Sequence, residues 1–538
     1  MLCKAICYAD GVLGIHKRAW GLCFVSAVLQ ILIFPLPGLY FLCWVALAPL
    51  LLALMQARSL DTLQLEFAAQ RFRSATPLQG FVLGQVCGTL WCAGSCNWVF
   101  QTMRQYGGLS APVAAIVTLV AAIYLGLYQG LFGLLFAWIA GDRSPVRRYA
   151  VALAPFLWVA VELARTRISA FPWNLLGSCQ VDNIPLSRFA TIAGVYGVSF
   201  EIALVNSAFA TAFLLPRPRR NRLVMAAAMA AAFLQIGRWI HPPQSPADRM
   251  ALLVQQNIPI EIGSGWTRDY FQHTLDDLRH FSTAPSSEHP DLIVWPESPA
   301  PFYTSDPIFR QAVGGMAHDT RTWVIAGSLG SDPAHMGGSS DTVYNSAALF
   351  NPEGELVARY DKVHLVPFGE FVPFRRFLPF ADVLTKEIGD FTHGASRAPL
   401  ATSQARLGVF ICYESVFPDE VRQFALGGAQ VFVNISNDGW YGDSGAWAQH
   451  LQQARMRAVE NNRWLLRATN TGYTAAIDPF GRVVAGIPRK VRTSLDAPYA
   501  LNDNTTFYTR HGDWFAYACA IIFLGAVLVR ILRRPSTS

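Results

Sequence analysis

Long apolar runs constrain the fold of this chain more than any other feature. Eight runs approach the roughly 20 residues that an α-helix needs to cross a bilayer. They cover residues 20–35, 40–55, 81–100, 113–140, 149–163, 190–215, 223–239 and 514–531. Hydrophobic residues form 52% of the 538-residue chain and charged residues only 15%, a balance too apolar for an ordinary soluble protein. We therefore expect a membrane α-helical bundle of about eight transmembrane helices.

Basic residues between these runs predict the orientation of the chain. If all eight runs cross, the segments on one side carry most of the arginines and lysines, among them Arg58, Arg147, Arg219 and Arg530. Cytoplasmic segments are enriched in Lys and Arg, so we expect both termini in the cytoplasm and residues 241–513 outside it. In a bacterium this describes an inner-membrane protein with a periplasmic domain. The net charge of +7 is divided among small clusters, so no nucleic-acid partner is expected.

The polar region 241–513 is predicted to form one α/β domain. Apolar runs indicate strands at residues 250–255, 292–295, 323–326, 346–350, 407–411, 431–435, 474–477 and 483–486. Helix-like stretches cover residues 269–281, 307–320, 418–425 and 447–463. This alternation favours a sheet with helices on its faces. The expected domains are residues 1–240 with seven spans, residues 241–513, and residues 514–538 with the last helix and a cytoplasmic tail.

Cys412 is a candidate nucleophile. It follows the strand-like run 407–411, and the ends of rigid elements are where reactive side chains are commonly held. It is the only cysteine between His241 and Gly512, so this region offers it no partner for a disulfide or a metal site. The alternative is a small core residue, since free cysteine is among the most buried residue types.

Two other polar residues occupy comparable positions. Glu297 follows the strand-like stretch 292–295, where a partly buried carboxylate is placed to act as a general base; the alternative is a solvated loop residue. Lys362 is one of only five lysines and adjoins an apolar run, so it is a candidate for stabilising an oxyanion. A lone lysine is otherwise most often a surface residue whose stem covers apolar neighbours.

Other catalytic mechanisms fit the sequence less well. It contains no Gly-x-Ser-x-Gly elbow, no His-Glu-x-x-His zinc motif and no phosphate-binding Gly-x-x-x-x-Gly-Lys loop. We expect neither a metal nor a cofactor. A cysteine–histidine pair through His364 or His450 stays open as the rival mechanism.

Three motifs together resemble a known family. Trp295-Pro296-Glu297-Ser298, Tyr360-Asp361-Lys362-Val363 and Ile411-Cys412-Tyr413-Glu414 are similar to the Glu-Lys-Cys triad of the nitrilase, or carbon–nitrogen hydrolase, superfamily. Joined to seven apolar runs before the domain and one after it, they resemble the apolipoprotein N-acyltransferases. Further similar motifs are Gln256-Asn257-Ile258-Pro259, Phe171-Pro172-Trp173 and Asn437-Asp438-Gly439-Trp440.

The resemblance implies a nitrilase-like α–β–β–α sandwich and a ping-pong acyl transfer. Cys412 would form a thioester with the sn-1 acyl group of a phospholipid, typically phosphatidylethanolamine, with Glu297 as base and Lys362 as oxyanion partner. The acceptor would be the amine of the S-diacylglyceryl cysteine of an apolipoprotein, in the last step of bacterial lipoprotein maturation. We expect a monomer in the bilayer. The residues that correspond to the family's supporting positions are Trp266, Glu370, Tyr413 and Glu414.

The segment after Glu370 is predicted to rest on the outer leaflet as a lid. The stretch 366–380 holds five phenylalanines, three prolines and two arginines, a composition that suits the headgroup boundary of a membrane. The alternative is that the rings fill the domain core. The lid candidates are Phe371, Phe374, Phe377 and Phe380.

Two other functions compete with acyl transfer. The runner-up is a membrane-anchored amidohydrolase of the nitrilase type. A transporter with a periplasmic binding domain fits less well, because few acidic residues lie within the spans. The candidates are Glu162 and Glu201. Glu162 lies beside Arg165, which favours a structural ion pair there.

Overall fold

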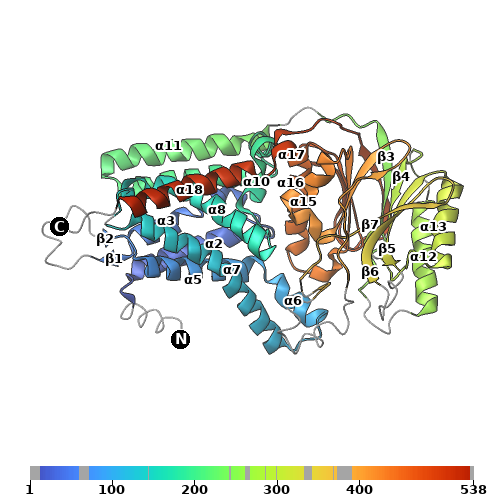
Figure 1. Cartoon of the computed structure of the whole chain (residues 1–538), viewed down its shortest axis with the longest axis horizontal. Coiled ribbons are helices and arrows are strands. Elements are labelled where there is room, and N and C mark those ends of the chain that lie inside the picture. Colours follow the sequence, from blue (N-terminus) through green and yellow to red (C-terminus); the bar gives the residue numbers. More distant parts are fainter. Residues whose placement is uncertain are drawn as a thin grey trace. The chain divides into compact units, whose positions relative to one another are not determined.

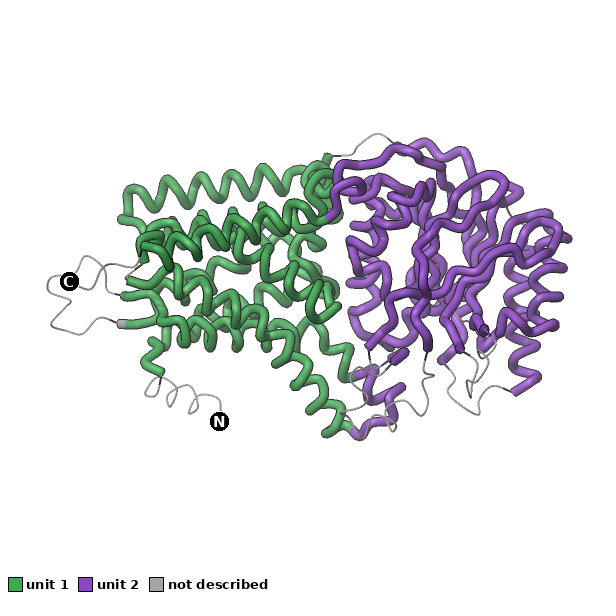
Figure 2. Tube along the Cα trace, in the orientation of Figure 1, with its two compact units in different colours: residues 1–100, 111–241, 513–538 green, residues 101–110, 242–512 purple. Residues whose placement is uncertain are grey.

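The structure is a computed structural model of the chain. It describes residues 13–59, 72–142, 144–240, 244–260, 267–284, 286, 288–297, 300–332, 342–367, 369–371 and 391–533. The chain divides into two compact units (Figure 2). The helical unit comprises Met1–Phe100, Ala111–His241 and Asp513–Ser538, and the α/β unit comprises Gln101–Ser110 and Pro242–Gly512.

The helices of the helical unit follow the apolar runs of the sequence (Figure 1). The long ones are α2 (Lys17–Leu32), α5 (Pro77–Ser95), α7 (Ala111–Ala140), α8 (Ala150–Ser169), α10 (Ala190–Leu214), α11 (Arg217–Ile236) and α18 (Trp514–Leu532). α5 packs against α2 and α7, while α8 packs against α7, α10 and α18. The shorter elements are η1 (Tyr40–Trp44), α3 (Ala48–Met55), β1 (Arg58–Ser59), β2 (Phe72–Arg73), η2 (Arg147–Tyr149), η3 (Leu176–Gln180), α9 (Ile184–Ser187) and η4 (Gly237–Trp239).

Four of the described helices are long and apolar enough to cross a membrane. They cover Ala111–Ala140, Arg147–Ser169, Ala190–Leu214 and Trp514–Leu532. α2 has only 16 residues, and α11 begins with a cluster of arginines, so these two helices lack the required combination of length and hydropathy. The bundle therefore contains several membrane-type helices, while the total of eight crossings stays a prediction.

The second apolar run differs from the continuous span that we expected. Residues Tyr40–Trp44 form η1, and α3 begins only at Ala48. Between them, the side chain of Asn206 accepts hydrogen bonds from the N–H groups of Leu47 and Ala48 (2.8 and 3.0 Å) and donates one to the carbonyl of Cys43 (2.7 Å). This buried asparagine on α10 satisfies backbone groups that the interrupted helix leaves unpaired.

Glycines set the close packing of α5 on α7. Gly80, Gly84 and Gly88 recur every four residues and therefore lie on one face of α5. A Cβ atom at Gly84 would come 2.0 Å from the carbonyl oxygen of Gln129, and one at Gly133 would come 2.1 Å from that of Gly80. The two backbones thus approach too closely for any larger residue, as in other tightly packed membrane helices.

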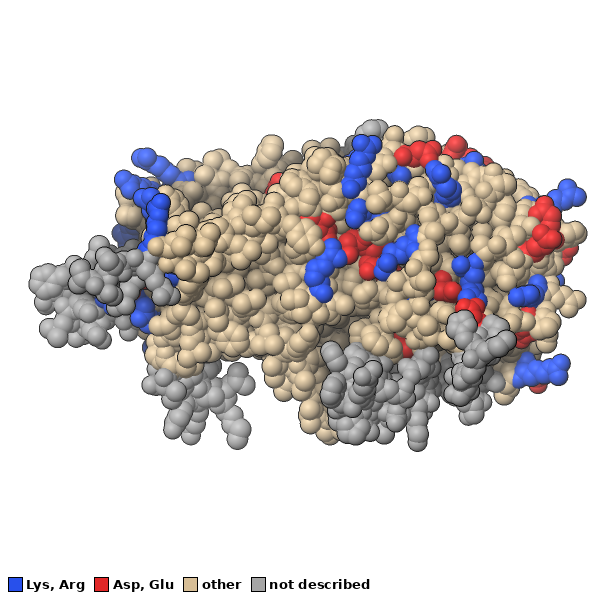
Figure 3. Space-filling model, viewed as in Figure 1, with Lys and Arg blue, Asp and Glu red and all other residues tan. Residues whose placement is uncertain are grey.

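Basic residues gather at one end of the helical unit, where α11 begins and α18 ends (Figure 1 and Figure 3). Arg147 Nη1 lies 2.9 Å from Asp142, and Arg58 Nη2 lies 3.9 Å from the same carboxylate. The Arg530 guanidinium lies 4.6 Å from the centre of the Trp138 ring. Arginines from distant parts of the sequence therefore share one end, while a broad face of this unit carries few charges (Figure 3).

Among the described residues, the α/β unit contains two six-stranded sheets. The first has the order β14–β3–β4–β5–β6–β7, with β3 (Arg249–Gln255), β4 (Leu292–Val294), β5 (Trp323–Asp332), β6 (Thr342–Phe350), β7 (Leu356–Asp361) and β14 (Thr493–Tyr499). The second has the order β13–β12–β11–β10–β9–β8, with β8 (Leu400–Ala401), β9 (Arg406–Ile411), β10 (Val431–Ser436), β11 (Leu465–Thr469), β12 (Thr474–Ile477) and β13 (Val483–Ile487). The central strands β3, β4 and β5 run parallel, as do β9, β10 and β11.

Alternating side chains along these strands build two cores. Leu253 joins the core between the two sheets, whereas its neighbours Leu252 and Val254 join the core beneath α12 (Arg268–Ser282) and α13 (Pro307–Thr320). α15 (Pro418–Leu426) and α16 (Ala446–Asn461) cover the other sheet (Figure 1). The unit is thus a four-layer α–β–β–α sandwich, as the family resemblance implies.

Candidate active site

Cys412 lies at the carboxyl end of β9. This strand pairs in parallel with β10, and it is buried from Leu407 onwards. At Cys412 the backbone enters the left-handed region (φ 48°), which few non-glycine residues adopt. The chain then turns directly into the short helix η7 (Cys412–Val416). The turn keeps the cysteine at the strand end with only 6% of its surface exposed.

Glu297 follows β4 and is almost completely enclosed. Its Oε1 accepts hydrogen bonds from Asn345 Nδ2 (2.8 Å) and Lys362 Nζ (3.3 Å). Its Oε2 accepts one from the backbone N–H of Asn437 (2.8 Å). The residue is 5% exposed, so it is not the solvated loop glutamate of the alternative interpretation. Hydrogen bonds to both oxygens hold the carboxylate in one orientation.

Lys362 follows β7 and lies between two carboxylates. It is 1% exposed, which rules out the surface role. Its Nζ donates to Glu370 Oε1 (2.9 Å) and Glu297 Oε1 (3.3 Å). Glu370 is fixed in turn, because its Oε2 accepts from Val366 N (2.8 Å) and its Oε1 from Asn345 Nδ2 (2.8 Å). The ammonium group is therefore locked in place by two acidic side chains.

Charge and burial set the protonation of this site. Burial alone would lower the pKa of the Lys362 ammonium, but Glu370, Glu297 and Cys412 together raise that pKa above its ordinary value. Burial raises the pKa of the Cys412 thiol, Glu297 raises it further, and Lys362 lowers it. At neutral pH the lysine is therefore charged and the thiol is protonated. A reaction at the sulfur needs a base to take its proton, and Glu297 is the carboxylate that acts on it most strongly.

Glu414 joins the segments that carry the cysteine and the lysine. Its Oε2 accepts from Ile411 N (2.7 Å), and its Oε1 accepts from the N–H groups of Val363 and His364 (2.7 and 3.0 Å). The Tyr360 hydroxyl donates to both oxygens (2.8 and 2.9 Å). One buried carboxylate thus fixes the end of β9 against the loop that follows β7. These contacts indicate that Glu414 positions the segments that carry Cys412 and Lys362.

The remaining predicted residues fall into two groups. Tyr413 is buried, and its ring packs at 5.2 Å from that of Phe417. Phe371 is half-buried, with its ring 5.3 Å from that of His393. The other candidates lie outside the described residues, namely Trp266, Phe374, Phe377 and Phe380.

Comparison with known proteins identifies the family. The profile described as Carbon-nitrogen hydrolase matches residues 252–503, and the profile described as Apolipoprotein N-acyltransferase N-terminal domain matches residues 26–208. A Geobacter metallireducens protein named Apolipoprotein N-acyltransferase is 35% identical over 97% of this chain and 97% of its own length. The chain belongs to the apolipoprotein N-acyltransferase family.

Two further similar proteins are a second named N-acyltransferase and a solved amidase. A Methylococcus capsulatus protein of the same name is 33% identical over 86% of this chain and 90% of its own length. A solved amidase from Nesterenkonia sp. is 19% identical over 51% of this chain and 96% of its own, with a TM-score of 0.36. The assignment therefore rests on the long matches to the named N-acyltransferases.

The two histidines of the rival mechanism have other partners in this N-acyltransferase. His450 Nδ1 lies 2.9 Å from Asp438, and its Nε2 lies 2.8 Å from Ser415 Oγ and 3.0 Å from the carbonyl oxygen of Cys412. Burial and Arg467 lower the pKa of His450, against the opposing effect of Asp438. His364 Nδ1 lies 3.6 Å from Glu420. Glu297 is therefore better placed than either histidine to serve as the base.

Two asparagines at this N-acyltransferase site were missed in the sequence. Asn345 on β6 donates to Glu297 and to Glu370, and Asn437 gives Glu297 its backbone N–H. Asn437 lies in one of the motifs on which the family resemblance rests, so the resemblance could have pointed to it. Asn345 lies in β6, just before the strand-like run 346–350, and has no local sequence signal of its own.

The chain between α5 and α7 contributes a further contact to the α/β unit. α6 (Trp98–Gln105) leads into the 101–110 segment, which belongs to this unit. The Tyr106 hydroxyl donates to the carbonyl of Gly439 (2.9 Å), and the Thr102 hydroxyl donates to that of Trp440 (2.9 Å). Gly439 N donates in turn to the Asn437 side chain (3.2 Å). The 101–110 segment thus supports the turn that holds Glu297.

Proposed function

We propose that this protein transfers a fatty acyl group from a membrane phospholipid, through a thioester on Cys412, to the N-terminal amine of diacylglyceryl apolipoproteins. The observation that carries the proposal is the buried cluster of Glu297, Lys362 and Cys412, which follow β4, β7 and β9. Membership of the N-acyltransferase family supports the same reaction.

In the first half-reaction Cys412 attacks the sn-1 ester. Glu297 takes the thiol proton as Sγ bonds to the ester carbonyl carbon, and negative charge develops on the carbonyl oxygen. Lys362, held charged between two carboxylates, stabilises that oxyanion. The bond to the glycerol oxygen then breaks, and Glu297 returns the proton to this oxygen. The products are an acyl-cysteine and a lysophospholipid.

In the second half-reaction an amine takes the acyl group. The α-amine of the apolipoprotein attacks the thioester carbonyl, Glu297 takes a proton from the nitrogen, and the carbon–sulfur bond breaks. The proton then returns to the sulfur. The thioester retains much of the reactivity of the original ester, so formation of an amide from it is downhill and requires no nucleotide.

The proposal also covers the membrane topology, the donor lipid, the oligomeric state and the role of Trp266. The gathering of Arg58, Arg147 and Arg530 at one end of the helical unit supports a cytoplasmic location for that end. In the proposed topology the chain crosses the bacterial inner membrane eight times, with both termini in the cytoplasm and the α/β unit in the periplasm. We further propose phosphatidylethanolamine as a donor, a monomeric state, and a supporting role for Trp266.

One assay tests the proposed reaction. The purified protein is incubated with a phospholipid labelled in its sn-1 chain and with a synthetic S-diacylglyceryl-cysteine peptide. We expect the label on the α-amine of the peptide and an equal amount of lysophospholipid. Release of labelled free fatty acid alone, with an unmodified peptide, would instead identify a hydrolase.

A further inference from the structure

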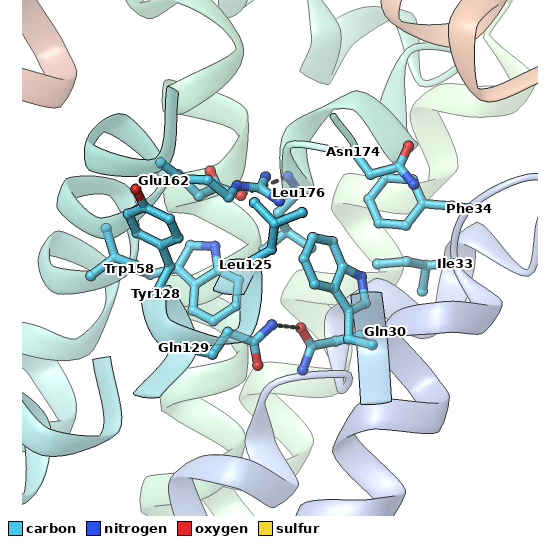
Figure 4. Close-up of a pocket in the computed structure, with 13 residues that line it drawn as sticks. Gln30, Ile33, Phe34, Leu125, Tyr128, Gln129, Trp158, Glu162, Asn174 and Leu176 are labelled. Atoms are coloured by element: carbon cyan, nitrogen blue, oxygen red, sulfur yellow. Dashed lines mark hydrogen bonds between the residues drawn. The ribbon is translucent and has the colours of Figure 1, made fainter. Parts of the chain in front are cut away.

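Each unit contains a buried polar cluster that the proposed reaction does not use. In the helical unit, Gln129 Nε2 donates to Gln30 Oε1 (2.9 Å) within a pocket among α2, α5, α7 and α8 (Figure 4). The wall of this pocket is mostly apolar and its free space suits a water molecule, so we assign no larger ligand to it. The cluster in the α/β unit is larger and reaches the backbone of Cys412.

The cluster in the α/β unit joins five elements. Its members are Ser415 on η7, Asn434 and Ser436 on β10, Asp438 on η8 (Asp438–Tyr441), His450 on α16 and Arg467 on β11. Each of these residues is at most 1% exposed. Charged and polar groups buried this completely are costly unless their partners are close and well oriented. The contacts within the cluster are accordingly short, and they lead from an ion pair to the nucleophile.

The ion pair is formed by Asp438 and Arg467. Arg467 Nη2 donates to both oxygens of the Asp438 carboxylate (3.0 and 2.8 Å), and the Ser436 hydroxyl donates to Oδ1 of the same group (2.9 Å). Arg467 Nη1 donates to the Asn434 side chain, whose Nδ2 donates to the carbonyl of Phe410 (3.1 Å). Burial alone would raise the pKa of Asp438, but the charge of Arg467 holds this pKa below its ordinary value. Asp438 is therefore a carboxylate at neutral pH, and the pair is fixed to β9 and β10.

His450 connects this ion pair to the nucleophile. On one edge of the ring, Nδ1 lies 2.9 Å from Asp438 Oδ1 and 3.1 Å from Arg467 Nη2. On the other edge, Nε2 lies 3.0 Å from the carbonyl oxygen of Cys412 and 2.8 Å from Ser415 Oγ. A carbonyl oxygen only accepts, so Nε2 carries a hydrogen and donates it to Cys412. The ring thus holds the backbone of the nucleophile.

Cys412 requires such support because of its backbone conformation. Its φ of 48° lies in the left-handed region, which is strained for a residue with a Cβ atom and persists only where surrounding contacts hold it. Glu414 holds the backbone on one side through Ile411 N (2.7 Å), and His450 holds the Cys412 carbonyl on the other (3.0 Å). The direction of the Cα–Cβ bond follows from the backbone, so these two contacts set where the thiol lies.

We propose that His450 is a positioning residue for the nucleophile, which holds the carbonyl of Cys412 while the Asp438–Arg467 pair holds the ring. This role rests on the reaction proposed for Cys412 and adds no proton transfer to it. With the carbonyl held, the thiol stays beside Glu297 and Lys362 in both half-reactions. Without this contact, the backbone can relax from the left-handed region and carry the sulfur away from its base. The rate constant of the chemical step therefore depends on His450, whereas the binding of lipid does not.

Two amide variants isolate the contact with the carbonyl. The amide of His450→Gln reaches the position of Nε2 and can donate to Cys412, whereas the shorter amide of His450→Asn ends at the position of Nδ1 and can contact only the ion pair. Neither amide can take a proton at neutral pH, so neither can serve as a base. The matched control is His289→Asn, because the exposed His289 also contacts a backbone carbonyl, with Nε2 2.8 Å from Thr320 O.

The rate constant and KM for acylation of Cys412 by a short soluble ester are measured with the full-length protein, together with the melting temperature of each variant. We expect His450→Asn to lower the rate constant about a hundred-fold, with KM changed less than about two-fold. His450→Gln should lose less than about ten-fold, the effect of one altered hydrogen bond, and His289→Asn should match the wild type.

Two results would overturn the proposal. Equal losses in His450→Asn and His450→Gln would point to His450 as a base, and unchanged rate constants in both would show that the cluster stabilises the fold only. If His450→Asn does not fold, His450→Gln decides, because a loss of about a thousand-fold in that folded variant is the effect of a missing base.

Alkylation of Cys412 by iodoacetamide, located by mass spectrometry, separates this role from the proposed reaction. Burial and Glu297 raise the pKa of the thiol, so a thiol released from its place ionises more readily. Cys412 should therefore be alkylated several-fold faster in His450→Asn than in the wild type, and at about the wild-type rate in His450→Gln. Equal rates in His450→Asn and the wild type would contradict the positioning role. A wild-type protein that forms no acyl-enzyme would refute the proposed function, and the alkylation rates would still test His450.

Discussion

Cys412, Glu297 and Lys362 are buried together, so the protonation of each depends on the charges of the other two. The ammonium group forms hydrogen bonds with Glu297 and Glu370, whereas the thiol carries no charge at neutral pH because burial and Glu297 raise its pKa. This arrangement keeps a proton on the sulfur until a substrate is present. It also places Glu297, the proposed general base, and Lys362, the proposed oxyanion partner, in the same side-chain network.

The charges around the thiol lead us to expect opposite changes of the Cys412 pKa in two variants. Glu297→Gln removes a charge that raises the Cys412 pKa, so the midpoint pH of its alkylation by iodoacetamide should fall. Lys362→Met removes the charge that lowers this pKa, so the midpoint should rise. Both variants should lose acyl transfer. Midpoints that move together, or that do not move, would contradict the assigned electrostatics.

The residues predicted from the sequence share one property. Glu297 and Cys412 each follow a strand-like run, and Lys362 is a rare lysine beside another, so local pattern and family resemblance both lead to them. Asn345 could not be found in this way. Its role arises because β6 lies beside β7 and in the same sheet as β4, so that its amide reaches Glu370, in the loop after β7, and Glu297, which follows β4. Such a contact depends on strand order, which a single sequence does not reveal.

At the scale of elements, the structure contains the strands and helices predicted for the α/β unit. It also contains strands that were not predicted, and those longer than the two-residue β8 are β7, β11 and β14. β11 carries Arg467, which is fully buried against Asp438, so a charged residue interrupts its apolar pattern. β14 contains Asp496 and Pro498 and lies at the edge of its sheet, where proline is tolerated. β7 mixes Arg359 and Asp361 with apolar residues. In each case tertiary contacts, rather than local periodicity, stabilise the strand.

The 101–110 segment gives an element-scale prediction. Tyr106→Phe removes the hydroxyl that holds the Gly439 carbonyl but keeps the ring, which packs 5.2 Å from that of Trp440. We expect the rate constant of acyl-enzyme formation to fall about two- to ten-fold, the effect of one hydrogen bond, with little change in KM. Tyr303→Phe, at an exposed tyrosine of the same unit, is the control. A changed KM with an unchanged rate constant would assign the segment to substrate binding instead.

The lid stays a prediction, because most of it lies outside the described residues. Replacing Phe374 and Phe377 together by serine should slow acylation by bilayer phospholipid much more than acylation by a short soluble ester. It should also raise the fraction of thioester lost to water, since a lid excludes the competing nucleophile. Equal losses with both substrates would show that the rings are core packing.

At the scale of the whole molecule, composition and the order of apolar runs were enough to predict a helical bundle joined to an α/β domain. The number of crossings is harder to predict, because hydropathy does not show where a buried polar residue interrupts a helix. Asn206 illustrates this, since it binds the backbone on both sides of the break before α3. Membership of the 101–110 segment in the α/β unit could not be predicted either, because it depends on contacts between residues that are far apart in the sequence.

The orientation can be tested with fusions to a reporter that is active only outside the cytoplasm. A fusion near Ala284 should be active, whereas fusions at Arg143 and after Arg534 should be inactive, because basic segments are retained in the cytoplasm. Matched expression of all fusions, checked by immunoblot, is the control. Activity at Arg143 would mean that the number of crossings before α8 is wrong.

The acyl-enzyme itself is the most direct test of the account. The purified protein is incubated with a phospholipid labelled in its sn-1 chain, without acceptor, and the label on the protein is mapped by mass spectrometry. We expect hydroxylamine-sensitive label on Cys412 in the wild type and none in Cys412→Ala, which should remain folded because the change removes little packed volume. Continued transfer of label to an acceptor amine by Cys412→Ala would contradict the central claim.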